Sequence, residues 1–152
     1  MNKSQVNKLI RLNDLRVRRQ EKKLSQTKIT YLESCGKVES RNTQINLIST
    51  ENKHLLEYLS LQTTSKSPIK REYVMIRKFW LSYDLEMHEY YLVQEIDEKN
   101  INLSKYQTEK KEWYKHIVRK TQLSLMQTKL LSKEKSKAEN SEDEFCQQNT
   151  LR

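Results

Sequence analysis

Residues 62–68 of the chain read QTTSKSP, and this short stretch decides the fold. It contains the single proline of the 152 residues, and the single glycine lies far before it. Ser67 followed by Pro68 is typical of a helix N-cap followed by the first helical residue. Compact folds use Gly and Pro at their many turns, so a chain with one of each has few turns. The sequence therefore predicts one turn, at about residues 62–67, between two long helices.

The run before this turn, about residues 4–61, carries a seven-residue repeat. Its first row is apolar apart from one asparagine: Ile10, Val17, Leu24, Tyr31, Val38, Ile45, Asn52 and Leu59. A second row, three residues further on, stays polar until its end: Asn13, Gln20, Thr27, Ser34, Arg41, Ile48 and Leu55. Two such rows are typical of a left-handed coiled coil, and the polar second row predicts a weak seam. Gly36 does not shift the repeat, so we expect the helix to continue through it.

The run after the turn, about residues 68–132, shows apolar residues that alternate by three and four. The first half holds Ile69, Tyr73, Ile76, Trp80, Tyr83, Met87 and Tyr90, and the second half holds Leu92, Ile96, Leu103, Tyr106, Trp113 and Ile117. The phase changes near Tyr90–Leu92, which predicts a coiled-coil discontinuity. Alternatively, it indicates that Tyr73, Trp80 and Tyr83 face something other than the first helix.

Two long helices joined by a short link pack as antiparallel neighbours. Folding about the turn pairs residues whose numbers add to about 130, such as Val17 with Trp113 and Arg41 with Glu89. We therefore predict an all-α fold, a long two-helix antiparallel coiled-coil hairpin over residues 1–132. The charged residues 133–152 predict a disordered C-terminal tail. The oligomeric state stays open, because the same seam could form a parallel dimer of bent helices.

Composition points to a partner-binding protein outside the membrane. Charged residues make up 32% of the chain and the formal net charge is +9, a balance that attracts nucleic acid, anionic membranes or acidic protein faces. The N-terminus lacks the apolar stretch of a signal peptide, and no run approaches the ~18 apolar residues of a membrane-spanning helix. Cys35 and Cys146 are far apart and are interpreted as free thiols. We expect a cytoplasmic protein without membrane insertion.

Residues for catalysis, metals or cofactors do not converge in the sequence. His54, His88 and His116 are scattered, and no CxxC or HxxxH spacing occurs. Neither cysteine has a positioned His partner, and one glycine cannot build a phosphate-binding loop. We expect no enzyme activity, no catalytic residue, no cofactor and no metal.

Two surfaces are candidates for binding. Eight Lys and Arg oppose two acidic residues over the first 23 positions, which fits either a solvated helix face or a surface for an acidic partner. Nucleic acid is disfavoured, because the first 30 residues hold no aromatic side chain for base stacking. The second surface arises from the neighbouring aromatic pairs Phe79–Trp80, Tyr90–Tyr91 and Trp113–Tyr114. Adjacent helix residues point about 100° apart, so one residue of each pair is expected to be exposed. Phe79 and Tyr91 are candidate interface anchors. Packing in the core explains Trp80 and Trp113.

Two stretches resemble a known family. Residues 7–26, NKLIRLNDLRVRRQEKKLSQ, resemble the start of the small coiled-coil stalk proteins of type III secretion systems. Residues 71–120 are similar to the second helix of the SpaM/InvI members, which are related to the flagellar FliJ. The matching positions there are Arg71, Glu72, Arg77, Lys78 and Trp113. A Ser-, Glu- and Asp-rich tail completes the likeness.

The resemblance implies a stalk of an injectisome. Such a protein inserts its paired chain ends into a hexameric secretion ATPase, and its hairpin reaches the cytoplasmic region of the export-gate membrane protein; it also binds secretion chaperones. The expected ATPase-ring contacts are Arg11, Arg16, Arg18, Arg19, Lys115 and Arg119. The expected export-gate or chaperone contacts are Phe79, Tyr83 and Tyr91. A general cytoplasmic coiled-coil adaptor or export-chaperone-binding protein, and a nucleic-acid-binding coiled coil, are the alternatives.

Overall fold

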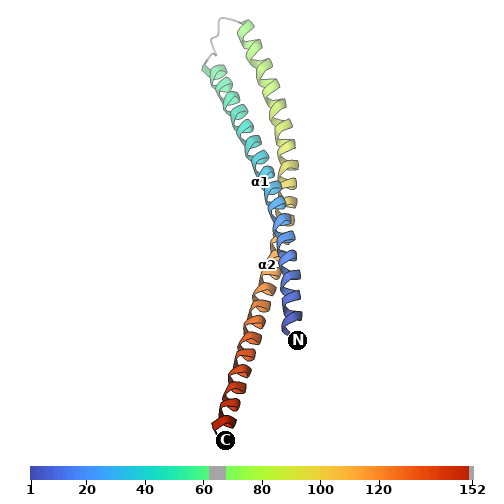
Figure 1. Ribbon diagram of the computed structural model, residues 1–152. Helices are drawn as coiled ribbons and strands as arrows, with labels where there is room; N and C mark the ends of the chain where they lie inside the picture. The colour runs from blue at the N-terminus through green and yellow to red at the C-terminus, as the bar shows by residue number, and fades with distance from the viewer. Residues whose placement is uncertain (62–67, 151–152) are drawn as a thin grey trace. The chain divides into compact units, whose positions relative to one another are not determined.

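Two long helices make up the described part of the chain (Figure 1). The computed structural model describes residues 1–61 and 68–150, in which α1 runs Lys3–Leu61 and α2 runs Pro68–Thr150. The predicted start and end of the first helix are confirmed to within one residue, as is the start of the second at Pro68. The predicted turn at 62–67, with its N-cap Ser67, lies outside the described residues.

A reciprocal cap starts α1. The backbone N–H of Gln5 donates to Asn2 Oδ1 at 2.9 Å, and the backbone N–H of Asn2 donates to Gln5 Oε1 at 3.1 Å. This exchange is a capping box, which satisfies two backbone donors that a helix start leaves unpaired. The cap accounts for a helix that begins at Lys3, one residue earlier than the sequence pattern indicated.

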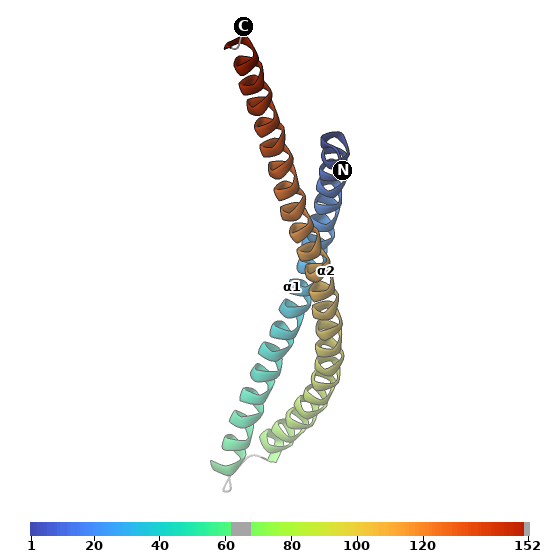
Figure 2. The same cartoon turned by 90° about the horizontal axis from the view of Figure 1, so that it is seen from below.

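Contacts between the helices fall into two units. Unit 1 consists of Met1–Gln26 with Gln107–Arg152, and unit 2 consists of Thr27–Tyr106. In each unit, residues further along α1 contact residues earlier in α2. Unit 1 contains Asn7–Gln127, Asn13–His116 and Gln20–Glu109, and unit 2 contains Ser34–Asn102, Arg41–Glu95 and Glu51–Arg77. Each unit is therefore an antiparallel helix pair, as predicted, and Figure 2 shows the two helices of unit 2 running side by side.

The predicted register holds for some cross-helix pairs in each unit and not for others. The numbers of Asn13 and His116 add to 129, close to the predicted 130. The predicted partner of Arg41 was Glu89, but Arg41 Nη2 pairs with Glu95 Oε1 at 2.8 Å, and the numbers add to 136. The short side chains of Ser34 and Asn102 pair with the same sum, so the length of the Arg41 side chain is not the reason. A seam residue of α1 lies between two positions of α2 and can contact either, as Arg41 does with His88 and Glu95, whereas the prediction gave each residue one opposite partner.

Both predicted rows of α1 face α2. Every residue from Ile10 to Leu59 in the first row, and from Asn13 to Leu55 in the second, is buried or half-buried. The helix continues through Gly36 without a break, as predicted. The heptad pattern of α1 was therefore assigned correctly.

The seam of α2 differs from the prediction in its first half, whereas every residue of the predicted second-half row except Ile96 is half-buried. Its first row is Val74, Leu81, His88, Glu95, Asn102, Glu109, His116, Leu123 and Leu130, all buried or half-buried. A second half-buried row is Lys78, Leu85, Leu92, Lys99, Tyr106, Trp113 and Gln127, with Lys120 exposed. Both rows keep one seven-residue spacing through Tyr90–Leu92, so the predicted discontinuity is wrong. The apparent phase change arose because apolar residues of a different face were assigned to the seam.

Polar side chains in the middle of the seam bond across it. In unit 1, Asn13 Nδ2 donates to the His116 carbonyl at 3.2 Å, and Gln20 Nε2 donates to the Glu109 carbonyl at 3.1 Å. In unit 2, Asn102 Nδ2 donates to Ser34 Oγ. Buried polar groups cost free energy unless they are hydrogen-bonded, so these bonds allow a polar row inside a helix pair.

The end of α2 carries no packed side chains. The sequence placed the end of the second helix at Ser132 and a disordered tail beyond it, whereas α2 continues to Thr150. Every side chain from Leu131 to Thr150 is exposed, so this segment is helical without burying a face. The exposed ion pair of Lys3 with Glu134, at 3.6 Å, links its start to α1.

Candidate interaction surfaces

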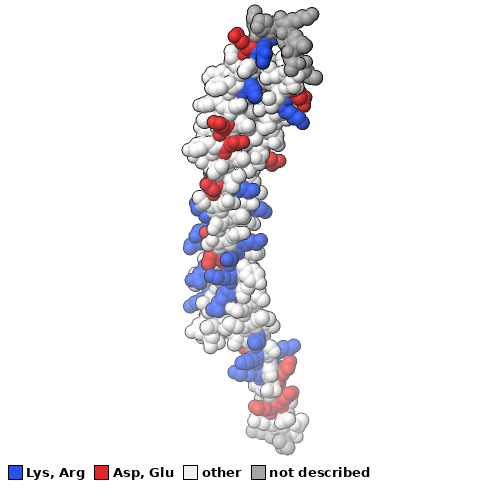
Figure 3. All heavy atoms as spheres, turned by 180° about the vertical axis from the view of Figure 1, so that it is seen from behind, with Lys and Arg blue, Asp and Glu red and all other residues white. Residues whose placement is uncertain are grey.

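The net charge of the chain lies in one of its two units. Unit 1 contains 18 Lys and Arg against 9 Asp and Glu, a net charge of +9, whereas unit 2 contains 11 of each. Figure 3 shows Lys and Arg gathered over the N-terminal segment of α1 and the adjoining part of α2. Unit 1 therefore carries the whole charge imbalance of the protein.

The six residues expected to contact an ATPase ring lie together in unit 1. The bond from Asn13 to His116 sets the α1 segment that holds Arg11, Arg16, Arg18 and Arg19 beside the α2 segment that holds Lys115 and Arg119. All six side chains are exposed. We name these six residues the basic surface.

The arginines of the basic surface are not neutralised within the chain. Among residues 1–61 and 68–150, none of the five arginines forms an ion pair, whereas Lys115 Nζ pairs with Glu112 at 3.0 Å. Lys115 is therefore partly compensated and the five arginines are not. Unpaired surface charge attracts a partner of the opposite sign over about a Debye length.

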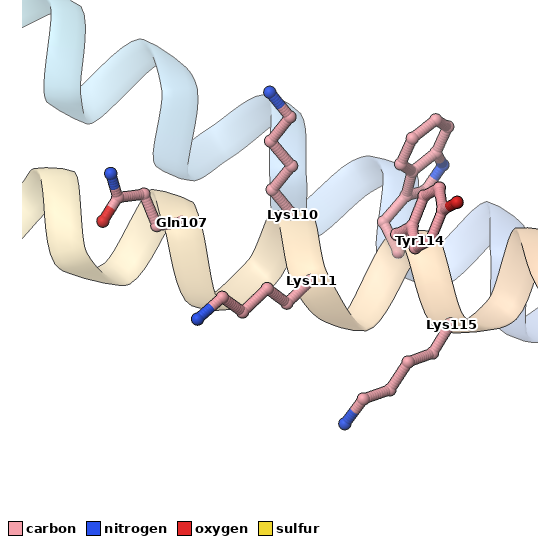
Figure 4. Close-up of a pocket in the computed structure, with 6 residues that line it drawn as sticks. Gln107, Lys110, Lys111, Tyr114 and Lys115 are labelled. Carbon is pink, nitrogen blue, oxygen red and sulfur yellow. The ribbon is translucent and has the colours of Figure 1, made fainter.

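An open hollow of about 670 Å³ borders the basic surface (Figure 4). It is lined by Gln107, Lys110, Lys111, Trp113, Tyr114 and Lys115. Figure 4 shows Lys111 and Lys115 extending to the same side of α2, away from Lys110 and Tyr114. The indole N–H of Trp113 donates to Glu21 at 3.5 Å, which holds that ring against α1. Aromatic rings therefore do lie beside the basic N-terminal helix, although the first 30 residues contain none.

The first-half row that the sequence assigned to the seam is exposed instead. Between 36% and 70% of each described side chain in this row is accessible to solvent: Tyr73, Ile76, Trp80, Tyr83, Met87 and Tyr90. We name these six residues the outer row; the side chain of Ile69 lies outside the described residues. The second of the two explanations offered for the phase change is therefore correct. Trp80 was expected in the core and is not there, whereas Trp113 is half-buried as expected.

Aromatic rings of the outer row pack on one another. The ring centroids of Phe79 and Trp80 are 5.7 Å apart, and those of Trp80 and Tyr83 are 6.1 Å apart, both edge to face. Phe79 and Tyr83 are exposed, as their assignment to a partner contact requires. Tyr91 is 41% exposed, and the Arg41 guanidinium lies 5.3 Å above its ring, so Tyr91 also belongs to the helix pair.

Arg41 is the centre of a polar cluster behind Tyr91. Its Nη1 lies 2.7 Å from His88 Nδ1, and its Nε and Nη2 donate to the Glu95 carboxylate. These bonds lower the pKa of Glu95 below its ordinary value and raise the pKa of Arg41. The cluster is charge-compensated and most of its surface is covered, so it stabilises the helix pair.

No protein-family model, no curated protein and no solved structure matches this chain. In the described part of the chain, no helix has an apolar stretch that could cross a membrane. Nor do three or more His, Cys, Asp or Glu side chains of that part converge as metal ligands would. The basic surface and the outer row are thus the features on which a function can be argued.

The sequence revealed the members of both surfaces but not the role of the outer row. Its three-four spacing was visible, and it was interpreted as the contact with α1 because it is more apolar than the true seam. The signal that could have separated them is the unbroken row from Val74 to Leu130, which keeps one phase through polar residues.

Proposed function

We propose that this protein is a non-enzymatic central stalk of a type III secretion ATPase complex. In this function its basic surface inserts into the hexameric ATPase ring, and its hairpin links the ring to the export gate at the cytoplasmic face of the apparatus. Phe79, Tyr83 and Tyr91 contact the export gate or secretion chaperones. The resemblance of residues 7–26 and 71–120 to stalk proteins motivates this proposal.

One observation carries the proposal: the whole net charge of +9 resides in unit 1, where the five exposed arginines of the basic surface lack an ion-pair partner among the described residues. The positive basic surface suits an acidic ring lumen, because charge complementarity accelerates docking and fixes orientation. The polar seam beside the basic surface is also suitable, since a helix pair with little apolar burial can adapt to an asymmetric ring.

Binding to the cognate ATPase tests the proposal. The variant Arg16→Glu/Arg18→Glu/Arg19→Glu is expected to lose pull-down of the ATPase and stimulation of ATP hydrolysis. The matched control, Lys133→Glu/Lys135→Glu/Lys137→Glu, makes the same charge change on exposed positions of the α2 end and should bind like the wild type. Undiminished binding by the arginine variant would remove the basic surface from the ring contact.

A general coiled-coil adaptor or chaperone-binding protein is the second candidate. The exposed outer row supports it, because large aromatic side chains in water are favoured interface anchors. Stimulation of a secretion ATPase separates the two: the stalk stimulates hydrolysis, whereas an adaptor binds chaperones and leaves the hydrolysis rate unchanged. Salt-dependent binding to random DNA or RNA would instead favour a nucleic-acid-binding coiled coil.

A further inference from the structure

The outer row has the spacing of a second helix-binding seam. Its residues alternate by three and four from Tyr73 to Tyr90, the same alternation that places the true seam of α2 against α1. Over these 18 positions a helix rises about 27 Å, at 1.5 Å per residue. A straight apolar strip of this length and spacing fits the apolar face of another helix.

Acidic side chains accompany the outer row. Between Tyr73 and Tyr90 the acidic residues are Asp84, Glu86 and Glu89 and the basic residues are Arg77 and Lys78. Arg77 is already paired with Glu51 at 3.0 Å, and Lys78 is half-buried in the seam with α1. Glu95 and Glu98 pair with α1, at 2.8 Å to Arg41 and 3.9 Å to Lys37. Glu86 and Glu89 are exposed and form no ion pair with any described residue. A helix that docks here meets negative charge at its edges.

A second copy of this chain fits the row poorly. Two outer rows packed in parallel would bring the same acidic side chains face to face, and like charges repel in a water-poor interface. Packed antiparallel, the acidic side chains would meet an Arg77 that Glu51 already holds at 3.0 Å. The basic outer side of α1 offers Leu12 and Leu15, but Arg19 and Lys22 follow at the next positions of that side. Its apolar strip thus covers about one turn, against about five turns for the outer row.

We propose that the outer row binds an amphipathic helix of another protein, with Leu, Ile, Val or Met at three-four spacing and Lys or Arg along both edges. The bound helix packs on the side of α2 that faces away from α1, so α2 lies between the bound helix and α1. This inference rests on one part of the proposed function, namely that a partner protein contacts Phe79 and Tyr83. The inference adds the chemistry of that partner.

A selection experiment on the full chain tests the inference. The probe is a displayed library of four-heptad helical peptides with Leu or Ile fixed at the core positions and Lys, Gln or Glu varied at the edge positions. Panning in near-physiological salt is expected to enrich peptides with Lys at the edges. Binding of the enriched peptides should fall at least about tenfold for Trp80→Lys/Tyr83→Lys, because central aromatic anchors dominate such interfaces.

The control variant is Leu47→Lys/Leu56→Lys, which makes the same kind of change at two exposed leucines of α1 in unit 2 and should bind like the wild type. Circular dichroism checks that both variants keep the helix content of the wild type. The inference is overturned by enrichment of Glu or Gln at the edges, by no enrichment, or by unchanged binding of the Trp80/Tyr83 variant. Self-association of the chain that Trp80→Lys/Tyr83→Lys abolishes also overturns it, since a second copy then occupies the row.

The outcome is independent of the ATPase experiment. The ATPase experiment measures binding through the arginines of unit 1, whereas the peptide selection measures binding to unit 2 alone. A selection that succeeds while ATPase binding fails would keep the helix-binding row and discard the stalk.

Discussion

Single polar residues decide how the two helices meet. Asn13, Gln20 and Ser34 occupy seam positions where a stable coiled coil places Leu or Ile, and each bonds to a residue or carbonyl of α2. Such pairs contribute less stability than apolar packing but penalise other registers, in which the same groups are buried without partners. The polar seam is therefore less stable than an apolar one, but it favours a single alignment of the two helices within each unit.

The Arg41–Glu95 pair makes stability depend on pH. The folded pKa of Glu95 lies below its unfolded value, so the pair stabilises the fold above about pH 4.3 and this contribution is lost as the pH falls through the folded pKa. We expect Glu95→Gln to lower the free energy of unfolding at pH 7 by about 1–2 kcal/mol, because the pair is mostly covered. Urea denaturation at pH 7 and pH 3 measures it, and the loss should shrink at pH 3.

The matched control is Glu98→Gln, since Glu98 forms an exposed ion pair with Lys37 at 3.9 Å. Exposed pairs contribute little, so this variant should stay within about 0.5 kcal/mol of the wild type. An equal loss of unfolding free energy in the two variants would show that the bonds from Glu95 to Arg41 stabilise the fold no more than an exposed ion pair does.

Asn52 is the one polar residue in the first, apolar row of α1. Its Oδ1 atom is buried and has no hydrogen-bond partner in the described chain. We expect Asn52→Leu to raise the free energy of unfolding by about 1–3 kcal/mol, the usual cost of an unsatisfied buried polar group. Asn46→Leu, at an exposed position of the same helix, controls for the change in helix propensity. A gain no larger than that of Asn46→Leu would mean that water reaches the Asn52 amide.

At the scale of the elements, α1 and the second half of the α2 seam were predictable, whereas the first half of the α2 seam was not. The row from Ile10 to Leu59 is apolar enough to mark its own face, and the bounds of the helix followed from Pro68 and the repeat. In α2 two faces share the three-four spacing, and the more apolar one is in water. Sequence reasoning chose by hydrophobicity, whereas the fold is decided by partners of His88, Glu95 and Asn102 that only the packed helices reveal.

A substitution of Gly36 tests whether α1 is one continuous helix. A Cβ built on Gly36 meets no atom within 4 Å, so Ala fits there without strain. We expect Gly36→Ala to raise the free energy of unfolding by about 1 kcal/mol, since glycine is the poorer helix former. Thermal unfolding followed by circular dichroism measures the change. An unchanged or lowered midpoint would indicate that the backbone around Gly36 leaves the helix in solution.

At the scale of the whole molecule, charge and apolar surface are separated along the sequence. The net charge belongs to unit 1, while the outer row and its acidic flanks belong to unit 2. The two proposals made above therefore concern different units and can be tested separately.

The charge of unit 1 also acts on its own stability. Like charges repel within the folded helix pair, and added salt screens this repulsion, so raising NaCl from about 0.05 to about 0.5 M should raise the unfolding midpoint by about 2–4 °C. The rise should shrink in Arg16→Gln/Arg18→Gln/Arg19→Gln, which removes three of the repelling charges. Lys53→Gln/Lys70→Gln/Arg71→Gln, which neutralises three exposed residues of unit 2, should respond to salt like the wild type. A midpoint that falls with salt would contradict the prediction, because it would mean that ion pairs such as Arg41–Glu95 outweigh the repulsion among the arginines.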